Sequence, residues 1–126
     1  MKKFINMQNR LVSMQKVILD TNFLLYILRN KVDLFSELNR ILDQNYKVCI
    51  LDKSLDELRG KKLGKLAVEF AKKYFKIIKT KKGKVDDLLL KQDAIIATMD
   101  KELKEKLKKR KKQIIIIRQK KYLKFD

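Results

Sequence analysis

The stretch Lys16–Leu28, KVILDTNFLLYIL, decides the fold of this chain. After Lys16 comes an aliphatic run without polar alternation, which is typical of a strand covered on both faces in a parallel sheet. An apolar helical pattern begins directly after Asp20-Thr21-Asn22, so the stretch predicts a strand, a tight turn and a helix. Asp20 then lies at the carboxyl end of the strand, where open α/β sheets bind their ligands. Capping of the helix by Asp20 or Asn22 explains the same residues equally well.

The rest of the chain repeats this alternation of strand and helix. It predicts an α/β fold in which helices cover both faces of a mainly parallel five-stranded sheet, a three-layer α/β/α sandwich. A further short helix is expected to begin at Ser54, with Glu57 completing a capping box. The later strands are expected at residues 46–51, 75–79, 94–98 and 113–117, and the other helices at 22–29, 33–43, 61–74, 85–90 and 100–112.

Residues 16–126 are therefore expected to form one domain, preceded by a basic N-terminal extension at residues 1–15. Apolar residues recur in this extension at alternating spacings of three and four, which indicates a short amphipathic helix. A flexible tail, or a chain that starts at Met14, explains the segment equally well. The apolar residues concerned are Phe4, Met7, Leu11 and Met14.

The charge of the chain indicates a polyanionic partner. Lys and Arg number 33 against 15 Asp and Glu, which gives a formal net charge of +18. Nucleic acid explains this excess better than anionic lipid. The apolar runs are too short to span a bilayer and no signal peptide is visible, so we expect a cytoplasmic protein without membrane association. The single cysteine, Cys49, lies in an aliphatic run and is expected to be buried.

The chain contains no histidine, and this restricts its chemistry. Ser-His-Asp and Cys-His catalysis, histidine acid–base chemistry and His-containing zinc sites are all excluded. With only three glycines, the sequence also lacks a glycine-rich phosphate loop. An enzyme of this composition has to work with carboxylates, lysines, hydroxyl groups or hard metal ions.

The acids of this basic chain fall where a parallel sheet can bring them together. Asp20 ends the first strand, Glu57 follows the second, Asp86 and Asp87 begin the helix before the fourth, and Asp100 follows the fourth. Carboxylate oxygens without His or Cys suit Mg²⁺ or Mn²⁺. A metal-activated water that attacks a phosphodiester is then the expected chemistry. The alternative is that each acid only caps or begins a helix.

Four short motifs, VILDTN, SLDEL, VDD and IIATMD, follow one another in the order seen in the PIN domain, which this chain resembles from Lys16 onward. The resemblance is greatest to small archaeal PIN proteins of the VapC toxin or rRNA-processing kind. It implies RNA cleavage with Mg²⁺ or Mn²⁺, an antitoxin partner in the case of a toxin, and a homodimer. Carried over by position, the metal-binding acids are Asp20, Glu57, Asp86 (or Asp87) and Asp100, with Thr21, Asn22 and Thr98 as supports.

The sequence departs from the PIN pattern near the last two acids. The stretch between VDD and AIIAT is about one helical turn shorter than in close relatives, and Met99 stands where Asn is usual. A catalytically inactive PIN-fold RNA-binding or ribosome-assembly module is therefore the alternative function. In either case RNA is expected to bind cations, although a solvated helix surface explains part of this charge. The expected RNA-binding residues are Lys79, Lys81, Lys82, Lys84, Lys108, Lys109, Arg110 and Lys111.

Overall fold

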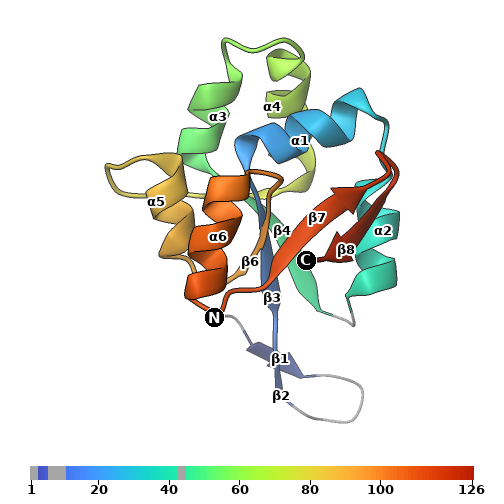
Figure 1. The fold of residues 1–126 in the computed structure, drawn as a ribbon, viewed down its shortest axis with the longest axis vertical. Coiled ribbons are helices and arrows are strands. Elements are labelled where there is room, and N and C mark those ends of the chain that lie inside the picture. The colour runs from blue at the N-terminus through green and yellow to red at the C-terminus, as the bar shows by residue number, and fades with distance from the viewer. Residues whose placement is uncertain (1–2, 6–10, 43–44) are drawn as a thin grey trace.

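A computed structural model describes residues 3–5, 11–42 and 45–126 of the chain. Its centre is a six-stranded sheet with the strand order β5-β4-β3-β6-β7-β8 (Figure 1). The first five of these strands are parallel to their neighbours, and β8 runs antiparallel to β7. The strands are β3 (Gln15–Leu19), β4 (Tyr46–Leu51), β5 (Lys76–Ile78), β6 (Ile95–Ala97), β7 (Ile114–Arg118) and β8 (Tyr122–Phe125).

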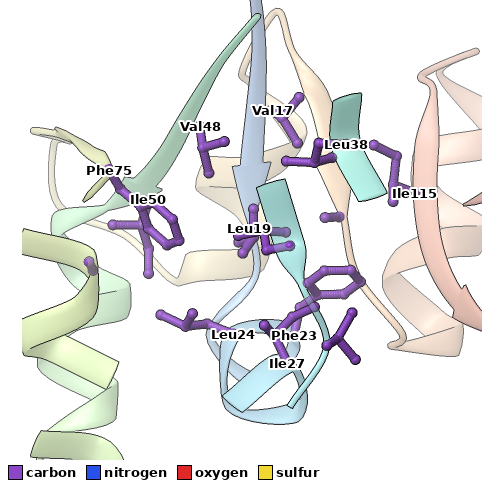
Figure 2. Packing of buried hydrophobic residues seen from close by; sticks show 14 of the residues in the cluster. Val17, Leu19, Phe23, Leu24, Ile27, Leu38, Val48, Ile50, Phe75 and Ile115 are labelled. Atoms are coloured by element: carbon purple, nitrogen blue, oxygen red, sulfur yellow. The ribbon is translucent and has the colours of Figure 1, made fainter. Parts of the chain in front are cut away.

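Helices cover both faces of this sheet, as the expected three-layer sandwich requires. Because successive side chains of a strand point to opposite faces, Val17 and Leu19 of β3 pack in one core cluster and Ile18 in the other. The first cluster includes side chains of α1, α2, α3 and α4 (Figure 2), and the second those of α5 and α6. The helices are α1 (Thr21–Arg29), α2 (Leu34–Ile41), α3 (Asp52–Leu58), α4 (Gly64–Tyr74), α5 (Val85–Leu90) and α6 (Lys101–Lys109).

The sixth strand, β8, lies in the charged tail where no element was expected, so the prediction of five strands is corrected to six. Leu123 of β8 is fully buried. Its backbone N–H donates to Glu37 Oε1 (2.9 Å) and its carbonyl oxygen accepts from Arg40 (2.6 Å), which fixes β8 to α2. The turn before β8 places Gln119 and Lys120 at φ of 53° and 54°. Neither is Gly or Asn, the residues that usually mark such a turn.

The N-terminal extension contains strands where a helix was predicted. β1 (Lys3–Ile5) pairs antiparallel with β2 (Leu11–Ser13) in a separate two-stranded sheet. This hairpin lies beyond the amino end of β3 (Figure 1). The amphipathic helix is therefore wrong for residues 3–5 and 11–13, while residues 6–10 lie outside the described part of the chain. The division of the chain at residues 15 and 16 stays a prediction, although β3 already begins at Gln15.

Helix α3 begins at Asp52, two residues before the predicted N-cap. The Asp52 carboxylate accepts hydrogen bonds from the backbone N–H and hydroxyl group of Thr80 and from the N–H of Lys53, and these bonds anchor the start of the helix. Ser54 lies inside α3 and is fully buried. The capping box of Ser54 and Glu57 is therefore wrong, and Glu57 is available for another role.

The junction between α3 and α4 depends on a glycine. A Cβ atom at Gly64 would overlap the carbonyl oxygen of Leu58, the last residue of α3, whereas Gly60 has open space around it. Gly64 is thus required for the close approach of these two helices. In the described ranges, no helix combines the length and apolar character needed to cross a bilayer.

Candidate active site

Three neighbouring parallel strands bring the predicted acids to the carboxyl end of the sheet. Asp20 directly follows β3, Glu57 lies on the helix after β4, and Asp100 is the third residue after β6. β4 and β6 flank β3. Asp86 joins them from α5, the helix before β6. We call this group, Asp20, Glu57, Asp86 and Asp100, the acidic cluster.

Asp20 is buried and held by three hydrogen bonds. Its Oδ1 accepts from the backbone N–H of Thr21 (2.8 Å), and its Oδ2 accepts from the Thr98 hydroxyl group (3.0 Å). Its own N–H donates to the carbonyl oxygen of Ala97 in β6 (2.9 Å). Asp20 also caps α1. Capping of α1 therefore does not exclude a role for the Asp20 carboxylate in binding a ligand at the end of β3.

Thr98 joins Asp20 to Asp100. While its hydroxyl group donates to Asp20, its Oγ1 accepts from the backbone N–H of Asp100 (3.1 Å). Asp100 caps α6 by accepting from the N–H of Leu103 (2.8 Å). Thr98 itself is fully buried. One buried hydroxyl group thus bonds to the carboxylate of Asp20 and to the backbone of Asp100, while the supporting role expected of Thr98 stays a prediction.

Thr21 makes the corresponding link to Glu57. Its hydroxyl group donates to Glu57 Oε1 at 2.6 Å, across 36 residues of sequence. Thr21 is buried and Glu57 is exposed, so the bond holds a surface carboxylate beside Asp20. The third expected support, Asn22, is exposed, and its Oδ1 accepts from Lys61 Nζ at 3.3 Å. Asn22 therefore contacts a cation instead of a predicted ligand.

Two acids of the cluster, Asp20 and Asp86, have a raised pKa. Burial raises the pKa of Asp20 to about 6, and repulsion from Asp86 and Glu57 adds to the effect against the hydrogen bonds from Thr98 and Thr21. Burial also raises the pKa of Asp86, with repulsion from Asp100, Glu57 and Asp87, while Lys106 lowers it. Negative charge is therefore concentrated at this end of a strongly basic protein. A cation bound there would relieve the repulsion.

Two hollows open at the acidic cluster. The first has a volume of about 310 Å³ and is lined by Asp20, Asn22, Leu25, Tyr26, Arg29, Met99 and Asp100. The second is about 400 Å³ and is lined by Lys53, Glu57, Gly83, Lys84, Val85 and Asp86. Each hollow therefore contains two of the four acids. Asp87 lines neither and is exposed, which favours Asp86 as the third acid.

The acids of the cluster fit Mg²⁺ or Mn²⁺ as pairs of carboxylate ligands. Within residues 14–42 and 45–126, no three acids stand close enough together to enclose an ion by themselves. Mg²⁺ does not need such a cage, because it commonly binds one or two carboxylates and completes its octahedron with water and substrate phosphate. The pairs Asp20–Asp100 and Glu57–Asp86, one in each hollow, meet this requirement.

Sequence reasoning missed several residues of these hollows. Tyr26 and Arg29 follow Asn22 at the i+4 and i+7 positions of α1 and share its side of the helix, so the helical spacing contained this signal. Lys53 carried no such signal. Met99, which replaces the usual Asn, is 40% exposed, and its sulfur accepts from the backbone N–H of Ile117 in β7 (3.2 Å). The thioether thus occupies the hollow next to Asp20.

The eight predicted RNA-binding residues divide into two groups. Lys79, Lys81, Lys82 and Lys84 lie between β5 and α5, and Lys84 lines the hollow that contains Glu57 and Asp86. Lys108, Lys109, Arg110 and Lys111 lie at the far end of α6, which begins beside Asp100. Only the first group is near the acidic cluster.

Comparison with known proteins agrees with this geometry. A family model described as a PIN like domain matches residues 17–120. The chain therefore belongs to the PIN-like domain family. It is 34% identical over 126 residues to Ribonuclease VapC4 of Methanocaldococcus jannaschii, an alignment that covers 86% of this chain and 95% of that protein. Among solved structures, that of the PIN domain endonuclease Utp24 is similar with a TM-score of 0.77 and 27% identity, covering 88% of this chain and 90% of the other.

These similarities confirm the resemblance drawn from the four motifs of the sequence. They also confirm the class of function that it implies, a PIN nuclease of the VapC-type or rRNA-processing kind.

Proposed function

We propose that this chain is an endoribonuclease that cleaves RNA phosphodiester bonds with the help of Mg²⁺ or Mn²⁺ at the acidic cluster. The observation that carries the proposal is the buried hydroxyl group of Thr98, which links Asp20 and Asp100 at the carboxyl end of the sheet. Such a link supports a fixed pair of oxygen ligands. The proposal is also supported by the similarity to a protein named Ribonuclease VapC4.

Each part of the site has a task in this reaction. Thr98 and Thr21 hold the carboxylates of Asp20 and Glu57 in place. A divalent cation, when bound, would activate water for attack on phosphorus and stabilise the leaving oxygen. Lys53 and Lys84 lie beside Glu57 in the second hollow, where their charges attract the phosphate backbone. Lys79, Lys81 and Lys82 extend this attraction along the loop before α5.

The role of the nuclease in the cell is a further part of the proposal. As a VapC-type toxin, the protein would have an antitoxin partner that covers the acidic cluster, and as an rRNA-processing enzyme it would need none. A homodimer fits either role. A catalytically inactive RNA-binding module remains the second candidate, because Met99 places a thioether beside Asp20 and Asp100 in the first hollow.

The test is cleavage of a labelled, partly structured RNA with Mn²⁺, with Mg²⁺ and with EDTA. We expect cleavage with either metal, none with EDTA, and a loss of more than about 100-fold in Asp20→Asn, because removal of a ligand exceeds the effect of removing its supports. Asp56→Asn is the matched control, since this exposed acid of α3 pairs only with Arg59. Comparing the cleavage activity of Asp86→Asn with that of Asp87→Asn identifies the third acid, since the variant that loses more activity has lost the metal ligand. Metal-independent binding without cleavage, equal in Asp20→Asn and the unchanged protein, would support the inactive module.

A further inference from the structure

The amino end of the sheet carries a concentration of positive charge that the proposed reaction does not use. A hollow of about 370 Å³ lies there, and four of its lining residues are cations, against a single acid, Asp93. The cations come from the start of β3 and from the connection between α6 and β7. They are Lys16, Arg110, Lys111 and Lys112, and we call this site the basic hollow.

The basic hollow lies at the opposite end of the sheet from the acidic cluster. Lys16 lies at the start of β3, whereas Asp20 follows its end. The nine residues of α6 likewise separate Asp100 from Arg110, and at 1.5 Å per residue they span about 13 Å. A phosphate bound in one site is thus too far from the other to contact it.

Two of the cations are held in place by the backbone. Arg110 donates to the carbonyl oxygen of Leu90 (3.3 Å), and Lys112 Nζ donates to that of Gln92 (2.6 Å). Leu90 is the last residue of α5, and Gln92 lies in the connection from α5 to β6. Neutral acceptors orient these side chains without cancelling their charge. The hollow is therefore a preformed site instead of a set of freely moving lysines.

None of the four cations has a carboxylate partner in the described part of the chain. The ion pairs there involve other basic residues, and nearby Lys108 pairs with Asp126 at 3.1 Å. A hollow with uncompensated cations attracts an anion with several negative oxygens. The proposed substrate is RNA, whose backbone carries one negative charge at each phosphodiester. The anion that fits the hollow is therefore another part of the same RNA.

We infer that the basic hollow is a second RNA-binding site, which binds the phosphate backbone several nucleotides away from the bond that is cut. This inference rests on the proposed function, because it assigns the ligand as RNA. It implies that RNA long enough to reach both ends of the sheet binds more tightly than a short oligonucleotide. The four predicted residues at the end of α6 then serve this site and its rim instead of the active site.

The test measures RNA binding in EDTA, so that cleavage does not enter. The variant Lys16→Gln/Lys111→Asn removes two charges and spares Arg110 and Lys112, which bond to the backbone. Asn suits position 111 because its φ is 57°. The matched control, Lys65→Gln/Lys72→Gln, removes two charges from exposed positions of α4. Thermal unfolding verifies that both variants fold.

We expect the variant to weaken binding of a structured RNA of about 40 nucleotides roughly five- to tenfold at low salt and to reduce the salt slope by about 1.4 to 1.8. Binding of a four-nucleotide RNA should change less than twofold. An equal loss in the control, or no loss in the variant, would overturn the inference. So would displacement of the RNA by polyglutamate as readily as by unlabelled RNA, because that result indicates an acidic protein partner. If the protein does not cleave RNA in the nuclease assay, this binding test still gives a result, because it is done without cleavage.

Discussion

The two ends of one sheet have opposite electrostatic character. At the carboxyl end, threonine hydroxyl groups hold Asp20 and Glu57 and Asp100 caps α6. Burial and repulsion from neighbouring acids raise the pKa of Asp20 and of Asp86. At the amino end, two of the four cations of the basic hollow bond to neutral carbonyl groups, and one acid lines the hollow with them. Lys16 and Asp20 are four residues apart along β3, which at about 3.3 Å per residue separates them by about 13 Å. The difference shows that opposite charges can be kept apart on one small sheet, and it fits the proposal that the amino end binds RNA and the carboxyl end a divalent cation.

The largest effect should come from disrupting the junction of α3 and α4, which supports the carboxyl end of the sheet. Gly64→Ala forces a Cβ atom against the carbonyl oxygen of Leu58, the last residue of the helix that carries Glu57. We expect the free energy of unfolding to fall by about 2 to 4 kcal/mol. Chemical denaturation measures the change. Gly60→Ala is the control, because its Cβ meets nothing within 4 Å, and an equal loss in both variants would refute the explanation.

The second prediction concerns the charge stored at Asp20. In the folded protein its pKa is about 6, above the ordinary 3.8, so the fold binds more protons than the unfolded chain between these values. The stability contributed by the protonated form is complete below about pH 4 and is lost as the pH rises through about 6. In EDTA, Asp20→Asn should therefore exceed the unchanged protein in stability at pH 7.5 by on the order of 2 kcal/mol, although we expect this variant to lose its cleavage activity.

Denaturant midpoints at pH 4.5 and pH 7.5 measure this difference. Asp56→Asn, which changes an exposed acid, should show no such dependence. A gain for Asp20→Asn that is the same at both pH values would argue against a raised pKa at this position.

The third prediction sharpens the role of Thr98. Thr98→Val removes the hydroxyl group that joins Asp20 to Asp100 and should reduce cleavage about 10- to 100-fold, as expected for a residue that orients a metal ligand. In the same variant, the Mn²⁺ concentration needed for half-maximal activity should rise. Thr98→Ser keeps the hydroxyl group and should restore most of the activity. Failure of Ser to restore it would mean that the methyl group, and so packing, is what matters.

The smallest effect is expected at Met99. Met99→Asn places an amide beside Asp20 and Asp100, and its oxygen can still accept from the N–H of Ile117. We expect initial rates of cleavage to increase by a few-fold, because a polar group there helps to orient ligands or water. Met99→Leu keeps the apolar character and should leave the rate unchanged. An equal increase in Met99→Leu would assign the effect to shape.

Sequence patterns predicted the parts of this molecule in which local and global signals agree. The aliphatic run before Asp20 and the helix start after it belong to β3 and α1 as expected. The acids were found because strand ends and carboxylates coincide. β8 was missed, since a strand of four residues within a basic segment resembles a tail and the turn before it lacks Gly and Asn. The predicted N-cap at Ser54 was wrong because the start of α3 is fixed at Asp52 by its hydrogen bond with Thr80, 28 residues away in the chain.

The positions of the basic residues depended on information that the sequence does not contain. Lys84 and Lys111 have the same charge and similar neighbours along the chain, yet they lie at opposite ends of the sheet. Along the chain, α5, β6 and α6 lie between them, and the packing of these elements decides where each lysine is placed. Similarly, the Thr21–Glu57 bond depends on how α3 packs beside α1, and no local pattern specifies such a contact.

β8 also has a consequence for solubility. It pairs with β7, whose sequence IIIIR contains four consecutive isoleucines. Without β8, β7 would present a flat, apolar and unpaired edge, the kind of segment that joins with copies of itself into fibrils. β8, which covers this edge and carries Lys124, therefore acts as a gatekeeper against aggregation. Because ribosomes make β7 first, the nascent protein passes through a period in which this gatekeeper is still missing.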